Sequence, residues 1–259
     1  MPDRTSGFIK TTYLMHYLKR TSRMPDCKIC TTLPPKSQSL SYQAALAENP
    51  ANVSRQGISL LGVALDGKVW KAFRTLSVTF LDNLTNEEQT QYREVIREWG
   101  NHINLDIVFT SERDADIRIK TKTSDNSSAV GTDALTVDVQ NPTMYIAEKP
   151  GSSRFRTVLL HEFGHALGFE HEHLHPYANI PWNKQKVYDH FTRLGMSRAA
   201  IDENFFTKIN QKMSVTAYDP KSIMHYPIEK TFTDGVFEVT ENTELSRLDI
   251  HMARTVYPR

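Results

Sequence analysis

The feature that most constrains this chain is the segment HEFGHALGFEHEH at residues 161–173, which follows the apolar run Val158-Leu159-Leu160. It gathers histidine and glutamate and contains no lysine or arginine. Two alternatives to a ligand site are a solvated polar face and a set of buried histidines bonded to the backbone. A polar surface helix would not follow three consecutive apolar residues, so we expect this segment to lie inside the fold.

The spacing of the histidines predicts a metal site. In a helix, His161 and His165 project from the same face and can reach one ion. On a continuous helix His171 would sit about 120° away from His165 and about 9 Å farther along the axis. Gly168 removes this obstacle because glycine readily takes the left-handed conformation that ends a helix and lets the chain turn back. We therefore predict that His161, His165 and His171 bind one metal ion.

Three neutral imidazoles suit zinc and leave the fourth position open for water, which distinguishes a catalytic site from a closed structural one. Zinc lowers the pKa of its water towards about 7, so a nucleophile is available near neutral pH. Glu162 lies about 100° around the helix from His161 and can reach that water without binding the metal. The segment thus predicts one Zn²⁺ per chain, with Glu162 as the general base.

Length and composition indicate one domain plus an extension, since 259 residues with 39% hydrophobic content can bury a sizeable core. Thirty-one Lys+Arg against thirty Asp+Glu leave a formal charge of +1, which gives no field for nucleic acid or an anionic membrane. No apolar stretch of about 18 residues occurs, so we expect a soluble protein. We also expect a monomer.

The N-terminus does not predict a general secretory signal peptide, because Lys10 and His16 interrupt the apolar segment FIKTTYLMHYL. The localisation stays open between secretion and delivery into a host cell by a non-classical bacterial route.

Cys27 and Cys30 are the only cysteines of the sequence, so a disulfide-stapled scaffold is excluded. Four alternatives remain for this pair: plain free thiols, a redox pair, half of a metal site, or a thiolate that blocks the active site.

Hydrophobic periodicity divides the chain into an N-terminal extension at 1–65, with at most one short helix, and a catalytic domain at 66–259. Thr85 and Glu88 predict a capping box at the start of a helix. Pro142 lacks a backbone donor, which favours a sheet edge for the strand that it begins. The pattern predicts strands at 75–81, 105–110, 115–120 and 141–147, and helices at 84–104, 154–168, 183–194, 197–208 and 245–258.

This succession predicts an α+β fold built on a mixed α/β layer, in which the helix at 154–168 lies against the sheet and a helical subdomain follows.

HEFGHALGFEH, with Glu172 directly after it, resembles the zinc signature of the metzincin endopeptidases, and its Gly-Phe-x-His-Glu ending resembles the astacin family in particular. SIMHY at 222–226 is similar to the methionine turn of astacins. The resemblance covers roughly residues 66–259 and is closest in kind to the short, single-domain bacterial and fungal branch.

The resemblance implies a zincin-like fold with a twisted, mostly parallel sheet, an antiparallel edge strand and an active-site helix. It implies that Met224 forms an apolar floor below the zinc, with Gly168 and Glu172 as further structural support. Tyr226 would be an extra, displaceable zinc ligand that assists at the oxyanion. An edge strand with Thr143, Met144 and Tyr145 would bind extended substrate through main-chain hydrogen bonds.

Two departures from the family pattern affect what the resemblance implies. The chain has no Phe-x-Gly-Asp segment of the sort that keeps astacin precursors latent, and Cys27 or Cys30 is a candidate substitute. His175-Pro176-Tyr177-Ala178 stand where many astacins have basic and acidic residues, so the specificity of those members does not carry over. His173 and His175 need no metal role, because three ligands suffice.

The sequence therefore predicts a zinc-dependent endopeptidase whose partners are protein or peptide substrates. A rival is a catalytically silent zinc or peptide-binding module with the same fold, but mere metal binding has no use for Glu162. A zinc exopeptidase would need a charged group that fixes a substrate terminus, and the sequence identifies none.

Overall fold

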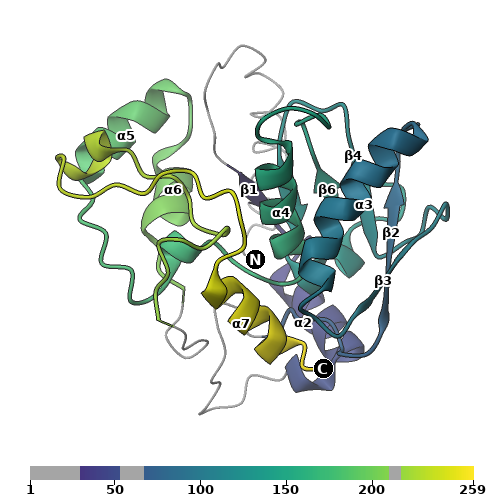
Figure 1. Cartoon of the computed structure of the whole chain (residues 1–259). Helices are drawn as coiled ribbons and strands as arrows, with labels where there is room; N and C mark the ends of the chain where they lie inside the picture. The colour runs from purple at the N-terminus through teal and green to yellow at the C-terminus, as the bar shows by residue number, and fades with distance from the viewer. Residues whose placement is uncertain (1–29, 53–66, 210–216) are drawn as a thin grey trace, which may run out of the picture.

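The computed structural model describes residues 30–52, 67–209 and 217–259 (Figure 1). A six-stranded sheet with the order β1-β5-β6-β4-β2-β3 forms its centre. All neighbouring strands pair in parallel except β5 and β6. The predicted α+β class with a mostly parallel sheet is confirmed. The strands are β1 (Thr31–Leu33), β2 (Thr75–Phe80), β3 (Asp106–Phe109), β4 (Ile117–Lys120), β5 (Ser127–Ala129) and β6 (Met144–Tyr145).

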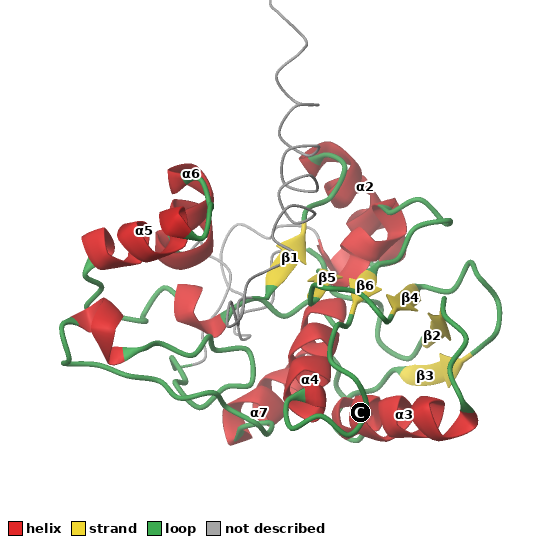
Figure 2. Ribbon diagram, turned by 90° about the horizontal axis from the view of Figure 1, so that it is seen from above, coloured by secondary structure: helices red, strands yellow, loops and turns green. Residues whose placement is uncertain are grey.

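Helices cover both faces of this sheet. Figure 2 shows α3 (Asn86–Gly100) and α4 (Phe155–Ala166) on one face and α2 (Gln38–Glu48) on the other. The main core lies between the sheet and the α3–α4 pair, where Leu76, Ile96 and Leu160 are fully buried. This packing holds α4, which carries two of the predicted ligands, as a rigid element.

Helix α3 forms where the capping box predicts it. The Thr85 side chain accepts a hydrogen bond from the backbone N–H of Glu88, and the Glu88 carboxylate accepts one from the N–H of Thr85. Its buried face includes Trp99, whose indole N–H donates to the carbonyl of Leu160 at 2.9 Å. The apolar residues of α3, spaced at the helical period, therefore form the face that packs against α4.

The C-terminal part is helical, as expected. It contains α5 (Lys184–Arg193), α6 (Arg198–Ile201), a π turn at Asp202–Phe206 and α7 (Arg247–Val256). The predicted helix at 197–208 is thus divided between α6 and the π turn. Phe191, Phe205 and Tyr226 belong to a second buried apolar cluster in this part. None of the described helices is long and apolar enough to cross a membrane.

The predicted edge position of residues 141–147 is wrong. Strand β6 lies inside the sheet, between β5 and β4. The Thr143 N–H donates to the carbonyl of Arg118, and the Thr143 carbonyl accepts from the N–H of Ala129. Pro142 does not disturb this pairing, because β6 begins two residues after it. The strand that runs antiparallel to its neighbour β6 is β5, and β1 covers its other side.

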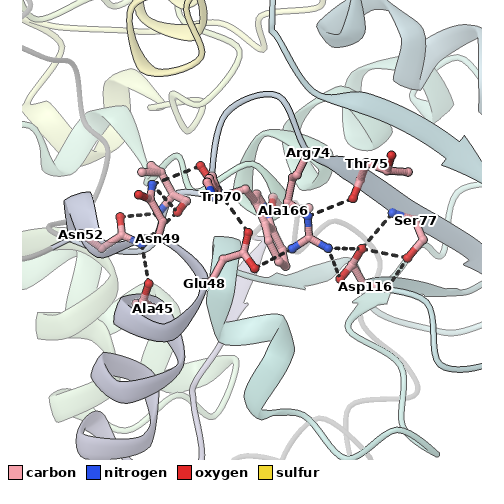
Figure 3. A network of polar contacts seen from close by, with 12 residues as sticks. Ala45, Glu48, Asn49, Asn52, Trp70, Arg74, Thr75, Ser77, Asp116 and Ala166 are labelled. Carbon is pink, nitrogen blue, oxygen red and sulfur yellow. Dashed lines mark hydrogen bonds and ion pairs between the residues drawn. The ribbon is translucent and has the colours of Figure 1, made fainter.

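The segment at residues 30–52 is attached to the rest of the fold through polar side chains (Figure 3). Arg74 pairs with Glu48 at 2.8 Å and with Asp116 at 2.8 Å. The Asn52 amide donates to the Val69 carbonyl at 2.9 Å. Within α2, the Ser41 hydroxyl donates to Asp133 at 2.5 Å. The proposed boundary at residue 65 falls outside the described residues and stays a prediction.

Side chains from distant parts of the chain cap the C-terminal end of α4. The Trp70 indole N–H donates to the carbonyl of Ala166 at 2.8 Å, and the Tyr257 hydroxyl donates to that of Leu167 at 2.6 Å. These carbonyls have no partner within the helix, so the two bonds satisfy them in a buried place. Gly168 follows with φ +96°, as its position after the helix predicts.

We expect Gly168→Ala to destabilise the protein, because a Cβ at this backbone angle would also lie 3.1 Å from the Lys68 carbonyl oxygen. Backbone strain of this kind costs on the order of 1–3 kcal/mol. Gly151→Ala is the matched control, since Gly151 has φ +86° with nothing within 4 Å of the added Cβ. Urea unfolding should show the larger loss for Gly168→Ala, and equal losses in the two variants would refute the role of the contact.

Candidate active site and metal centre

The three predicted ligands meet at the C-terminal half of α4. His161 and His165 lie on the helix, and the turn at Gly168 brings His171 back, so that its Nε2 lies 3.0 Å from the Nε2 of His165. All three residues are buried. Cys30 completes the group: one ligand atom from each of the four residues lies within 4.8 Å of the others.

Backbone carbonyls orient two of the imidazoles. Nδ1 of His161 lies 2.8 Å from the carbonyl oxygen of Ile223, and Nδ1 of His165 lies 2.7 Å from that of Phe169. A carbonyl can only accept, so each Nδ1 carries the proton and each Nε2 presents a lone pair to the centre. The Nε2 of His161 has no hydrogen-bond partner among the described residues. Converging lone pairs without protons suit a bound cation, so the donor set fits a metal ion.

The protonation states agree with this arrangement. Burial lowers the pKa of His161 to about 4. Burial and the neighbouring histidines also hold the pKa values of His165 and His171 well below their ordinary value. The rings are therefore neutral near pH 7, which is the form that binds metals.

Glu162 lies beside this group without belonging to it. It is fully buried, and no N–H or O–H in the described part of the chain donates to either carboxylate oxygen. The thiol of Cys30 is its polar neighbour. Burial raises the pKa of Glu162 to about 8, and the contact with Cys30 opposes this rise. A carboxylate with a raised pKa beside an open donor set is a candidate for proton transfer.

Met224 packs under α4 at Gly164. A Cβ on Gly164 would lie 2.4 Å from the Met224 sulfur, so no side chain fits between the helix and this turn. Asp249 of α7 accepts from the N–H of Ile223 at 2.8 Å and from the hydroxyl of Ser222 at 2.6 Å. Helix α7 thereby holds the turn whose Ile223 carbonyl orients His161.

Glu172 ties the segment after His171 to the same turn. Its N–H donates to the carbonyl of Met224 at 3.0 Å, and its carboxylate accepts from the N–H of Asp219 at 2.8 Å. These contacts are consistent with structural support as the role of Glu172.

Tyr226 lies beside the group of ligand histidines and Cys30. Its ring centroid is 4.3 Å from that of His171, and its hydroxyl donates to the backbone carbonyl of Cys30. A cavity beside it is lined by Thr157, Val158, His161 and Pro227, among other residues. The phenol thus reaches a peptide carbonyl next to the ligand histidines.

The proposed substrate strand does not join this group in the predicted way. The backbone groups of residues 143–146 already pair with β4 and β5, and Met144 is fully buried. Thr143, Met144 and Tyr145 therefore cannot offer a free edge to a substrate.

Sequence reasoning left two residues at the site without a role. Four roles stayed open for Cys30, and no local pattern in the sequence places it beside His161. His173 was set aside because it is not needed as a ligand, although its ring stacks on Tyr226. Cys27 lies outside the described residues.

Comparison with known proteins agrees with the geometry. The family model of the astacin peptidases matches residues 63–257. Tolloid-like protein 1 of Homo sapiens is 24% identical over 193 aligned positions, and the match covers 68% of this chain and 17% of that protein. The chain thus spans about a sixth of the length of this relative.

Among solved structures, one of myroilysin aligns with a TM-score of 0.71 and 32% identity over 76% of this chain and 98% of that one. A second myroilysin structure aligns with a TM-score of 0.61 and 30% identity over 90% of this chain and 91% of that one. High choriolytic enzyme 1, a hatching enzyme zinc-protease from Oryzias latipes (medaka), shares the fold at 17% identity and a TM-score of 0.51, over 78% of this chain and 98% of that one. The chain belongs to the astacin family of peptidases.

Proposed function

We propose that this chain is a zinc-dependent endopeptidase that hydrolyses peptide bonds in proteins. The observation that carries the proposal is the convergence of three neutral imidazoles with the carboxylate of Glu162, which receives no N–H or O–H donor in the described part of the chain. Family membership supports zinc as the cofactor and a protein or peptide as the substrate.

His161, His165 and His171 would hold the zinc ion, one per chain. When bound there, zinc lowers the pKa of water and polarises the scissile carbonyl. Glu162 takes the proton of the attacking water and later gives it to the leaving amine. Its burial supports this role, because a carboxyl group with a raised pKa both accepts and returns a proton near neutral pH.

Tyr226 would donate its hydroxyl to the substrate carbonyl oxygen as negative charge develops on it. The bond from this hydroxyl to the Cys30 carbonyl supports the assignment, since it brings the phenol to a peptide oxygen beside the ligand histidines. Such a donor typically contributes on the order of 10²-fold to the rate. In the absence of a peptide, the hydroxyl would serve as a displaceable metal ligand.

We assign the substrate-binding edge to β5 in place of residues 143–145. In this structure β1 pairs with β5, with Thr31 opposite Ser127 and Leu33 opposite Ala129. Because β1 occupies the edge of β5 through its main chain, an extended substrate would pair with β5 in the same way.

Two rival functions are less well supported. A silent zinc-binding or peptide-binding module has no need of a buried carboxylate beside the ligands. An exopeptidase needs a free charge for a substrate terminus, but Arg154 and Glu241 at the cavity beside His161 pair with each other at 2.7 Å. Endopeptidase activity uses the buried carboxylate of Glu162 and needs no free charge for a substrate terminus.

We expect Glu162→Gln to keep its zinc and its fold while hydrolysis falls by about 10²–10⁴-fold, because only the base is removed. Elemental analysis and thermal unfolding check the first part, and cleavage of a peptide library with blocked and free termini checks the second. Turnover at the wild-type rate would make the assigned role of Glu162 wrong, and cleavage confined to free termini would favour the exopeptidase.

We further propose that residues 1–65 form an N-terminal extension that keeps the site closed through Cys30. Its thiol lies among the ligand nitrogens and next to Glu162, which is the position that the attacking water needs. Burial and Glu162 raise the pKa of the free thiol. A metal ion counteracts this rise, because a coordinating thiol is deprotonated.

We expect Cys30→Ser in the full chain to raise hydrolysis at least about tenfold, since a serine hydroxyl is a much poorer metal ligand than a thiolate. Cys27→Ser is the matched control and should leave the rate unchanged. Rates are compared on the same protein substrate with zinc content measured for each variant. Equal rates for wild-type and Cys30→Ser chains with equal zinc would reject the blocking role.

A further inference from the structure

Among the rings of the described residues that contact Tyr226, that of His173 lies closest to the phenol and most nearly parallel to it. Their centroids are 4.2 Å apart at an interplanar angle of 20°. His171 lies at 4.3 Å but is tilted by 54°, and the centroids of His171 and His173 are 5.4 Å apart. These distances place His171 and His173 on neighbouring sides of the phenol, with His173 over its face.

His173 is itself held firmly. It is fully buried, and its Nε2 lies 2.7 Å from the carbonyl oxygen of Asn204 in the π turn. Because that carbonyl only accepts, Nε2 donates and the orientation of the ring is set. The backbone carbonyl of His173 accepts from Nζ of Lys208 at 3.2 Å.

A rigid ring over one face of a phenol restricts how the phenol can move. Tilting towards His173 is blocked at a centroid distance of 4.2 Å, whereas a slide within the plane of the phenol keeps the stacking contact. The proposed role of Tyr226 requires such a movement, because its hydroxyl must leave the metal and meet the substrate oxygen.

We propose that His173 is a positioning residue for Tyr226: its ring, anchored on Asn204, guides the phenol between the metal site and the substrate carbonyl. This inference rests on the proposed role of Tyr226. It gives His173 a function that does not depend on binding the metal. Misplacing a catalytic group by about 1 Å can cost on the order of 10²-fold in rate, so a stacked guide has a measurable effect.

His175 offers a matched control in the same segment. It is also fully buried, but among the described residues its ring contacts Tyr177 at 5.5 Å and Tyr218 at 6.3 Å and not Tyr226. His175→Leu therefore removes a buried imidazole without touching the phenol, and it measures the general effect of such a loss on stability.

The experiment is a double-mutant cycle in the full chain carrying Cys30→Ser. We expect His173→Leu to lower kcat about tenfold while KM stays within about twofold of its value in the parent chain. His173→Phe and His175→Leu should each keep kcat within about threefold of the parent value. In a Tyr226→Phe background, His173→Leu should have no further effect beyond about twofold. An undiminished effect of His173→Leu in that background would overturn the proposal, and so would a normal kcat for His173→Leu alone.

A second readout is independent of turnover. With Cu²⁺ in place of zinc in the chain carrying Cys30→Ser, a phenolate oxygen on the metal should give a charge-transfer absorption band, and Tyr226→Phe should abolish it. We expect His173→Leu to weaken or shift this band and His173→Phe to retain it, and an unchanged band in His173→Leu would contradict the proposal. If Tyr226→Phe hydrolyses at the wild-type rate, the oxyanion role of Tyr226 fails, and the copper band alone then decides whether His173 positions the phenol.

Discussion

The return of the chain at Gly168 is the constraint on which the site depends. Helix α4 can place His161 and His165 on one face, but His171 reaches them only because the helix ends and reverses there. The reversal requires φ +96° and brings Gly168 against the backbone of Lys68. A turn of three residues therefore converts a pair of helical histidines into a three-nitrogen site, beside which the Cys30 thiol lies in this structure.

Long-range contacts hold this turn in place. Trp70 and Tyr257, which lie near opposite ends of the family match, donate to the last carbonyls of α4. Asp249 of α7 holds the methionine turn at 222–226 by a hydrogen bond. This turn orients His161 through the Ile223 carbonyl and packs against Gly164. The site is thus supported by segments before and after α4, so its rigidity is a property of the whole fold. Supports of this kind set the geometry of metal ligands and of groups that move protons.

Local patterns predicted the parts of the structure that local physics decides. The capping box at Thr85, the buried face of α3 and the helix end before Gly168 are all confirmed. The order of strands is decided by contacts between distant segments. The lack of a backbone N–H at Pro142 is a local feature, so it could not show that β6 lies inside the sheet. Strand β1 and Cys30 were not placed for the same reason: a bond between Cys30 and Tyr226 joins residues 196 positions apart, and no periodicity encodes it. His173 was set aside because the spacing of histidines identifies metal ligands and carries no information about residues that pack against Tyr226.

X-ray absorption at the zinc edge tests the central claim most directly, because it reports the atoms around the metal without requiring a substrate. For the full chain loaded with one zinc ion, the account predicts three imidazole nitrogens at about 2.0–2.1 Å and one sulfur at about 2.3 Å. In Cys30→Ser the sulfur should disappear while all three nitrogens remain. Fewer than three imidazole nitrogens in either protein, or a shell that Cys30→Ser leaves unchanged, would contradict the site described for this chain.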